Sequence, residues 1–308
     1  MKLQSSLTPV EVADLLKITK NTVYELIKRG ELPSYKIGKK IRVDLVDVEN
    51  YINFQKNKYT VINNTPAHQD KVDNKTIIIS GQDIILDILA KHIEKNIKNI
   101  SVLGSHIGSY NGLYELYHDR VSISSTHLWD GDLDEYNSSF IKKLLPGIPC
   151  TLINLAYRIQ GFYVAKGNPK NINTWSDLTK NDVKFINREK GSGTRILIDE
   201  KLRILNISSS DINGYTDEES SHLSISSVVS RGSADVGVGN EKVALQVNSI
   251  DFIPLQKERY DLVIKKEHLS SCTYKSILSI INSIEFKNEI KGLGGYDISD
   301  TGKIISDF

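Results

Sequence analysis

The stretch FINREKGSGTRILIDE, residues 185–200, joins a short apolar run to a polar loop with two glycines and then to an apolar, helix-like segment. Proteins use this arrangement of strand, glycine-bearing loop and helix to point backbone N–H groups at an anion. Three interpretations are therefore open: a nucleotide-phosphate loop of an enzyme, a pocket for a smaller oxyanion, or a tight turn. No lysine follows the second glycine, as the G-x-x-x-x-G-K-[ST] phosphate loop requires, and this removes the first interpretation.

Short apolar runs alternate with helix-like segments around this stretch, from residue 76 to residue 308. Such alternation predicts an α/β fold with mostly parallel strands covered by helices. The double apolar run at 151–166 suits a crossing between two lobes, and a return near residue 250 would complete a two-lobed clamshell. In such folds the ligand lies in the cleft, at the carboxyl ends of strands where helices begin.

Several loops at those places carry hydrogen-bond donors. A fully ionised tetrahedral oxyanion such as molybdate or tungstate offers only acceptors, so its pocket needs N–H groups, hydroxyls and an arginine. We expect contacts from Ser80, Ser109, Arg188, Ser192, Gly193 and Thr194. Ser192 and Thr194 also lie where they would cap the following helix. Phosphate, partly protonated near neutrality, would in addition need a carboxylate acceptor, for which Asp83 and Glu189 are candidates.

The first sixty residues contain two helix starts in quick succession. Thr8 can cap the first helix, with Pro9 at its first position and Glu11 completing a capping box. A second start at Thr19 opens KNTVYELIKRG, which has an apolar inner face and a polar, basic outer face. Two short helices joined by a tight turn form the helix-turn-helix pattern, whose second helix can enter a major groove.

A basic hairpin follows this pair of helices. Two short β-like runs, 34–37 and 40–43, flank a Gly-Lys turn, and the hairpin carries Lys36, Lys39, Lys40 and Arg42. Residues 1–60 hold 11 Lys and Arg against 7 Asp and Glu, whereas the rest of the chain holds 28 against 31. This asymmetry indicates a polyanionic partner for the N-terminal part, with the hairpin placed to contact phosphates.

The N-terminal unit resembles the excisionase and MerR-like winged helix-turn-helix domain over essentially residues 5–54. The matching positions are Thr8, Glu11, Ala13, Leu16, Thr22-Val23-Tyr24, Gly30-Glu31-Leu32-Pro33, Lys36-Ile37-Gly38, Arg42 and Tyr51-Ile52. The resemblance implies binding to double-stranded DNA, with groove contacts from Lys20, Asn21, Thr22 and Tyr24. It also implies that the wing contacts DNA through Lys39, Lys40 and Arg42.

Residues 76–308 resemble the periplasmic-binding-protein-like domain that occurs in the cytoplasm, fused to DNA-binding domains or to molybdopterin-biosynthesis proteins. The matching stretches include SGQDIILDILA, SHIGSYNGLYEL, STHLWD, FINREKGSGTR, SRGSADVGVG and ERYDLVI. The arginine and GSGT of the opening stretch are also similar to an element of tungstate- and molybdate-binding proteins of ABC importers. The family's usual Ser-His-Asp in the first loop is Gln82-Asp83 here, and the resemblance makes Gln82 a further candidate for ligand contact.

These features divide the chain into three parts. Residues 1–54 are expected to form the winged helix-turn-helix domain, 55–75 a polar linker, and 76–308 a two-lobed, type II periplasmic-binding-protein-like domain. Lobe 1 is expected to comprise about 76–155 and 251–308, and lobe 2 about 160–250.

The composition suits a globular protein of the cytoplasm. The chain is 39% hydrophobic and 25% charged, and it has neither an apolar run of the roughly 20 residues a membrane span needs nor an apolar signal core. Only Cys150 and Cys272 are present, which argues against a disulfide framework. The sequence contains no nucleophile elbow, metal-ligand spacing or Rossmann fingerprint, so we predict neither an enzyme nor a metal site.

Together these observations predict a one-component transcriptional regulator, acting as a homodimer, that binds DNA and senses a small oxyanion. Molybdate or tungstate is the expected ligand. Two alternatives stay open. The same architecture would serve a larger organic ligand such as a molybdopterin precursor, and the N-terminal domain would also serve as an excisionase-like architectural DNA-binding module.

Overall fold

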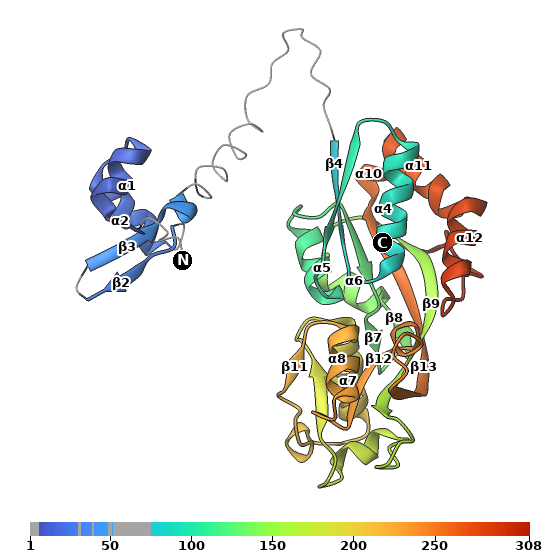
Figure 1. The fold of residues 1–308 in the computed structure, drawn as a ribbon. Coiled ribbons are helices and arrows are strands. Elements are labelled where there is room, and N and C mark those ends of the chain that lie inside the picture. Colours follow the sequence, from blue (N-terminus) through green and yellow to red (C-terminus); the bar gives the residue numbers. More distant parts are fainter. Residues whose placement is uncertain (1–5, 30–31, 39, 49–50, 52–74) are drawn as a thin grey trace. The chain divides into compact units, whose positions relative to one another are not determined.

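The computed structural model describes residues 6–29, 32–38, 40–48, 51 and 75–308 (Figure 1). The chain forms two compact units, Met1–Lys71 and Val72–Phe308. Most of the expected linker and Lys39 of the expected wing lie outside the described residues. Among the described residues, no helix has the length and apolar character needed to cross a membrane.

The N-terminal unit has the predicted pair of short helices. α1 (Pro9–Leu16) begins with the predicted capping box, in which the Thr8 hydroxyl accepts from the Glu11 N–H and the Glu11 carboxylate accepts from the Thr8 N–H at 2.6 Å. α2 (Lys20–Lys28) is capped by the hydroxyl of Thr19. Both predicted helix starts are therefore confirmed.

A three-stranded antiparallel sheet completes this unit. β2 (Tyr35–Ile37) and β3 (Lys40–Asp44) form the predicted hairpin, and β1 (Ser6–Leu7) pairs with the other side of β3. Residues 45–48 continue as a helix. The elements share a small apolar core made of Val12, Ala13, Val23, Leu26, Leu32, Val43 and Val48.

The larger unit consists of two lobes joined by two long strands (Figure 1). Lobe 1 contains β4 (Lys75–Ser80), α4 (Ile84–Asn96), β5 (Ile100–Ser105), α5 (Ser109–Tyr117), β6 (Ile123–Thr126), β7 (Trp129–Asp130), β8 (Glu135–Tyr136), α6 (Ser138–Leu144), α10 (Lys266–Leu269), α11 (Cys272–Asn282), α12 (Ile284–Leu293) and β14 (Ile304–Asp307). Lobe 2 contains η1 (Trp175–Thr179), β10 (Phe185–Arg188), α7 (Gly193–Ile204), η2 (Ser209–Asp211), β11 (Glu218–Glu219), α8 (His222–Ser230), β12 (Val236–Asn240) and α9 (Glu241–Ala244).

The two long strands, β9 (Cys150–Ala165) and β13 (Ile250–Lys265), pair antiparallel along their length, with two irregularities in β13. They lie in the middle of a nine-stranded sheet of order β11-β10-β12-β9-β13-β6-β4-β5, in which β14 also pairs with β9. The pairs β4–β5 and β4–β6 of lobe 1 and β10–β11 and β10–β12 of lobe 2 are parallel, as predicted. The pairs β6–β13, β12–β9, β14–β9 and β7–β8 are antiparallel. The central pair is antiparallel because the chain leaves lobe 1 along β9 and returns along β13.

The two halves of each long strand belong to different apolar cores. Ile153 of β9 and Leu262 of β13 are buried in the core of lobe 1, whereas Phe162 of β9 is buried in the core of lobe 2. Leu255 of β13 packs against the lobe 2 core as well. The return crossing therefore lies beyond Leu255 rather than near the expected residue 250, because β13 is paired with β9 before it leaves lobe 2.

Four helices begin at the junction of the lobes. The loops after β4, β5, β10 and β11 lead into α4, α5, α7 and α8. Asp83 caps α4, Ser192 caps α7 and Ser221 caps α8 through side-chain hydrogen bonds. Since β4 is parallel to β5 and β10 is parallel to β11, the carboxyl ends of these strands and the helix starts that follow them gather at one edge of the sheet.

Candidate functional site

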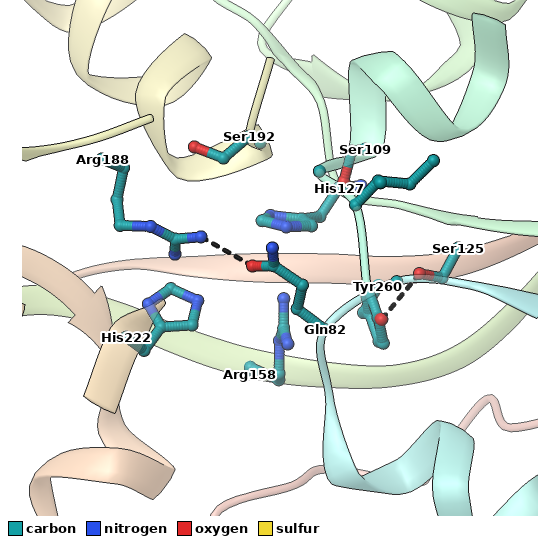
Figure 2. Close-up of a pocket in the computed structure, with 13 residues that line it drawn as sticks. Gln82, Ser109, Ser125, His127, Arg158, Arg188, Ser192, His222 and Tyr260 are labelled. Carbon is teal, nitrogen blue, oxygen red and sulfur yellow. Dashed lines mark hydrogen bonds between the residues drawn. The ribbon is translucent and has the colours of Figure 1, made fainter. Parts of the chain in front are cut away.

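A small cavity lies between the lobes, at the amino ends of these four helices (Figure 2). Its lining comes from both lobes and from the crossing strands: Gly81, Gln82, Ile107, Gly108, Ser109, Ser125, His127, Arg158, Arg188, Ser192, Gly193, His222 and Tyr260. Helix amino ends carry unpaired N–H groups and partial positive charge, so four of them around one cavity favour an anion. No carboxylate is found among the described residues that line it.

The lobes contact each other directly beside the cavity. The N–H of Tyr110 in α5 donates to the carbonyl oxygen of Gly191 in lobe 2 at 3.0 Å. A Cβ at Gly108 would lie 2.5 Å from that same oxygen, and a Cβ at Gly193 would lie 2.6 Å from the His127 ring. The structure is therefore the closed form of the domain, and the missing side chains at positions 108 and 193 permit this closure.

Arg188, the last residue of β10, supplies the positive charge of lobe 2 and is 2% exposed. Its Nε and Nη2 donate to the Glu189 carboxylate at 2.8 and 2.9 Å, and Nη2 also donates to Gln82 Oε1 at 2.7 Å. Within the described part of the chain, Nη1 makes no hydrogen bond. This nitrogen is therefore available as a charged donor to a ligand.

Arg158 lies on β9 and is held by carboxylates from two directions. Its Nε donates to Glu258 Oε1 on β13 at 2.7 Å, and its Nη1 forms an ion pair with Asp83, the N-cap of α4. The guanidinium also lies 4.0 Å from the centroid of the Tyr260 ring. Because Asp83 and Glu258 neutralise its charge, the main role of Arg158 is to hold the side chains around the cleft in position rather than to attract an anion.

His127 and Glu258 extend this buried network. His127 Nδ1 donates to Glu258 Oε2 at 2.6 Å, and Gln160 Nε2 donates to the same oxygen at 2.8 Å. Burial by itself would raise the pKa of Glu258, but the charges of Arg158 and His127 outweigh burial and lower the pKa to about 2. Glu258 is therefore ionised at neutral pH and neutralises its arginine partner.

Two serine hydroxyls of lobe 1 keep a hydrogen for a ligand. Ser125 Oγ accepts from the hydroxyl of Tyr260 at 2.7 Å (Figure 2), and Ser109 Oγ accepts from the N–H of His127 at 3.3 Å. A hydroxyl that already accepts one hydrogen bond still has its own hydrogen to donate. Both serines line the cavity and can therefore donate to an oxyanion.

His222, the first residue of α8, places an unpartnered nitrogen at the cavity. The residue is 9% exposed, and its Nδ1 has no hydrogen-bond partner within the described residues. Burial, followed by the charges of Arg188 and Arg158, lowers its pKa well below 6.5. A neutral imidazole has one donor and one acceptor nitrogen, so His222 can hydrogen-bond a ligand in either sense.

The structure gathers most of the ligand residues predicted from the sequence. Those that line the cavity are Gln82, Ser109, Arg188, Ser192 and Gly193. Ser192 also caps α7, as expected: its hydroxyl accepts from the Arg195 N–H at 3.2 Å and donates to the Glu189 carbonyl at 2.9 Å. Ser192 consequently has no hydroxyl hydrogen left for a ligand.

Ser80 and Thr194 do not line the cavity. Ser80 is fully buried, and its hydroxyl donates to Ser124 at 3.1 Å inside lobe 1. Thr194 Oγ1 is buried and has no hydrogen-bond partner in the described part of the chain. A position at the end of a strand or at the start of a helix therefore does not by itself bring a hydroxyl to the cavity.

Eight lining residues were not among the predicted contacts, and five of these have side chains that can hydrogen-bond: Ser125, His127, Arg158, His222 and Tyr260. Two of them carried a signal in the sequence. Arg158 is a charge in the middle of the apolar run 151–166, and His222 directly follows a serine that can cap a helix. The other three come to the cavity through the pairing of β6 with β13, which the sequence does not show.

The N-terminal unit exposes the residues predicted to contact DNA. On α2 the exposed residues are Lys20, Asn21, Thr22 and Tyr24, whereas Val23 and Leu26 are buried. In the hairpin Lys40 is exposed and Arg42 is half-buried, while Lys39 lies outside the described residues. Because these side chains are exposed, the outer face of α2 can enter a groove of DNA.

Comparison with known proteins agrees with both units. Residues 90–282 match the PBP superfamily domain, and residues 6–56 match a helix-turn-helix domain. The chain is thus a DNA-binding helix-turn-helix domain joined to a periplasmic-binding-protein-like, ligand-binding domain. YvgK from Bacillus subtilis strain 168 is 42% identical over 305 residues, which cover 98% of each chain. The chain belongs to the PBP superfamily and to the same family as YvgK.

Solved structures share the fold. A phosphate ABC transporter substrate-binding protein from Clostridium perfringens, with bound phosphate, superposes with a TM-score of 0.55 at 18% identity, covering 72% of this chain and 99% of that one. An OxyR mutant from Corynebacterium glutamicum, with bound H2O2, gives a TM-score of 0.51 at 12% identity, covering 93% and 89%. At these identities the similarity concerns the fold alone, and it agrees with the predicted two-lobed domain.

Proposed function

We propose that this chain is a ligand-responsive transcriptional regulator whose two-lobed domain senses a small tetrahedral oxyanion, with molybdate or tungstate as the ligand. One observation carries the proposal. Four helix amino ends converge on a cavity whose described lining contains serine, histidine and arginine side chains but no carboxylate. Such a site favours a small anion, and the helix-turn-helix domain supplies the means to act on DNA.

The donors at the cavity suit a fully ionised oxyanion. Arg188 Nη1 and the hydroxyl hydrogens of Ser109 and Ser125 have no acceptor within the described part of the chain. Asp83 and Glu189, the carboxylates that would accept a hydrogen bond from monoprotonated phosphate, are both ion-paired with arginines and do not line the cavity. This arrangement supports molybdate or tungstate over phosphate.

Phosphate is the second candidate, because one observation favours it. The neutral His222 has an unpartnered Nδ1, and in the tautomer with the hydrogen on Nε2 this atom would accept the hydrogen of a monoprotonated phosphate. The Clostridium perfringens protein of the same fold binds phosphate. The cavity measures about 20 Å³, so a larger organic ligand such as a molybdopterin precursor would require a larger rearrangement of its lining than a small oxyanion.

Regulation would follow from a change in the arrangement of the two lobes. A ligand that binds one arrangement of the lobes better than another shifts the population of the domain towards that arrangement. In a homodimer in the cytoplasm, this shift would change how two helix-turn-helix domains fit successive half-sites on DNA. Binding of the oxyanion and binding of DNA would then be linked. Each would change the affinity of the protein for the other by the same factor.

Thermal unfolding of the full chain with molybdate, tungstate, sulfate or phosphate at millimolar concentration tests the ligand. Selective binding to the folded state must raise the melting temperature. We expect a rise with molybdate or tungstate and a loss of that rise in Arg188→Met. A rise with phosphate alone would make phosphate the ligand, and no rise with any ion would disprove oxyanion sensing.

Binding to DNA from upstream of its own gene, measured with and without the ion, tests the regulatory part. An affinity that changes with the ion is the expected result. Specific binding with the same DNA affinity in the presence and absence of the ion would instead support the architectural role of an excisionase-like module.

A further inference from the structure

Gln82 occupies the centre of the cavity and connects the two lobes. The residue belongs to lobe 1 and immediately precedes the N-cap of α4, but its Oε1 accepts from Arg188 Nη2 in lobe 2 at 2.7 Å. Its Nε2 donates to Glu189 Oε1 in lobe 2 and to the His106 carbonyl in lobe 1, both at 3.3 Å. Figure 2 shows the Gln82 amide lying between the side chains of Arg188 and Arg158.

The size of the cavity shows what the amide does there. The space left beside Gln82 measures about 20 Å³, and a single water molecule already needs roughly 10–15 Å³ of such space. A tetrahedral oxyanion carries four oxygens around a central atom and is too large for this remainder. In this cleft the ion therefore needs space that a movement of the Gln82 side chain would provide.

The orientation of the Gln82 amide gives a second, chemical reason why its side chain would move when an anion binds. Its oxygen accepts from Arg188 Nη2, next to the Nη1 that is available to a ligand, so an anion held by both nitrogens would place an oxygen at the same position. An acceptor oxygen in contact with the oxygens of an anion would be repulsive. Gln82 Oε1 thus lies where one oxygen of a bound anion would lie.

A groove next to the cavity could hold the displaced Gln82 side chain. A groove of about 460 Å³ lies against α4 and β5 on lobe 1, and Gly81 and Gln82 line this groove as well as the cavity. Rotation of Gln82 towards the groove would vacate the cavity without any change in the fold.

We propose that Gln82 is a built-in competitor of the ligand: it holds the empty domain closed by occupying the anion's place on Arg188, and the anion must displace it. This inference deepens the proposed function and rests on it for the identity of the ligand. It makes Gln82 the residue that sets the affinity of the sensor, since binding has to break the contact between the lobes that Gln82 makes.

Calorimetric titration of the full chain with molybdate and with tungstate tests the competition. Gln82→Ala removes the competitor and should bind the ion about tenfold tighter than the wild type, because the unoccupied state loses a charge-assisted hydrogen bond. Gln82→Glu puts a carboxylate on Arg188 and should bind at least about tenfold more weakly. Gln246→Ala, the same change at an exposed position of lobe 2, should match the wild type.

Hydrogen exchange without any oxyanion tests the closure separately. The Tyr110 amide donates across the lobes to Gly191, so it is protected only while the cleft is closed. We expect this amide to exchange faster in Gln82→Ala than in the wild type and in Gln246→Ala, while amides in the centre of β9 stay protected in all three.

The two measurements separate the possible failures. Unchanged exchange at Tyr110 in Gln82→Ala overturns the proposal whatever the ligand is, because Gln82 would then not hold the lobes together. Weaker or equal ion binding by Gln82→Ala overturns the competition and makes Gln82 an ordinary ligand contact or a bystander. If no variant binds molybdate or tungstate, the proposed ligand is wrong, and faster exchange at Tyr110 would still support closure by Gln82.

Discussion

Arg158 and Glu258 face each other at the place where the two long strands cross between the lobes. They are register partners in the pairing of β9 with β13, and their buried side chains form an ion pair at 2.7 Å. Through Asp83 the same arginine reaches the start of α4. The crossing is therefore joined electrostatically to the first helix at the cavity.

Breaking this pair should strongly destabilise the domain. Arg158→Met removes the cation that two buried carboxylates share, and the loss of one partner of a buried ion pair costs about 3–5 kcal/mol. Chemical denaturation at pH 7 measures the change in the free energy of unfolding. The matched control is Lys166→Met, which breaks the exposed ion pair with Asp251 near the far end of the same two strands and should cost about 1 kcal/mol or less. Equal costs for the two variants would contradict a structural role of Arg158.

Stability should fall as the pH drops below 6.5, in part because of His222. The lowered pKa keeps this buried side chain neutral in the folded state, while the unfolded chain takes up a proton near pH 6.5. Since the unfolded state then binds more protons, the free energy of unfolding decreases towards acid, by up to about 1.4 kcal/mol per pH unit. Denaturation at pH 8.0, 6.5 and 5.5 should show a shallower decrease for His222→Gln, and an unchanged decrease would contradict the assignment.

Gly108→Ala should block closure while leaving the fold intact. Gly108 has φ of −68° and ψ of 162°, which alanine adopts without strain, but the added Cβ would lie 2.5 Å from a backbone oxygen of lobe 2. We expect faster hydrogen exchange at the Tyr110 amide and at least tenfold weaker oxyanion binding. Gly292→Ala is the control, because a Cβ there meets nothing within 4 Å. Full closure of the Gly108 variant would show that the contact between the lobes adapts.

Lys20→Ala should weaken DNA binding mainly through the phosphates. Lys20 is exposed at the start of α2, where a helix-turn-helix domain meets the groove and its backbone. Binding to a random 30-base-pair duplex at several salt concentrations should show a lower affinity and a salt slope reduced by about 1. Lys275→Ala, an exposed charge on α11, should leave both quantities unchanged. The prediction fails if Lys20→Ala keeps the slope of the wild type.

The parts of the fold that depend on local physical chemistry were predictable. The Thr8 capping box, the start of α2 at Thr19 and the hairpin around Gly38 each involve residues a few positions apart, so the sequence displays them directly. The loop before α7 was recognisable for the same reason. Ser192 caps the helix and Gly193 follows it, and both line the cavity.

The boundary between the lobes was harder to predict from the sequence. The apolar run of β13 continues across the crossing, and only its pairing with β9 and its packing at Leu255 show where lobe 2 ends. The outcome for Ser80 has a similar cause. A serine at a strand end can face the cavity or the interior of the lobe, and the hydroxyl of Ser124 across the sheet decides that it faces the interior.

The sequence by itself determined the helix starts, the basic hairpin, the alternation of strands and helices, and the glycine-bearing loop at 191–193, because these are set by residues close together in the chain. Only the tertiary structure decided the composition of the cavity. Arg158, His127 and His222 lie in three separate parts of the chain that the two crossing strands bring together. No short-range pattern in the sequence predicts that these side chains are close to one another. The same holds for Gln82, whose partner Arg188 lies 106 residues away, in the other lobe.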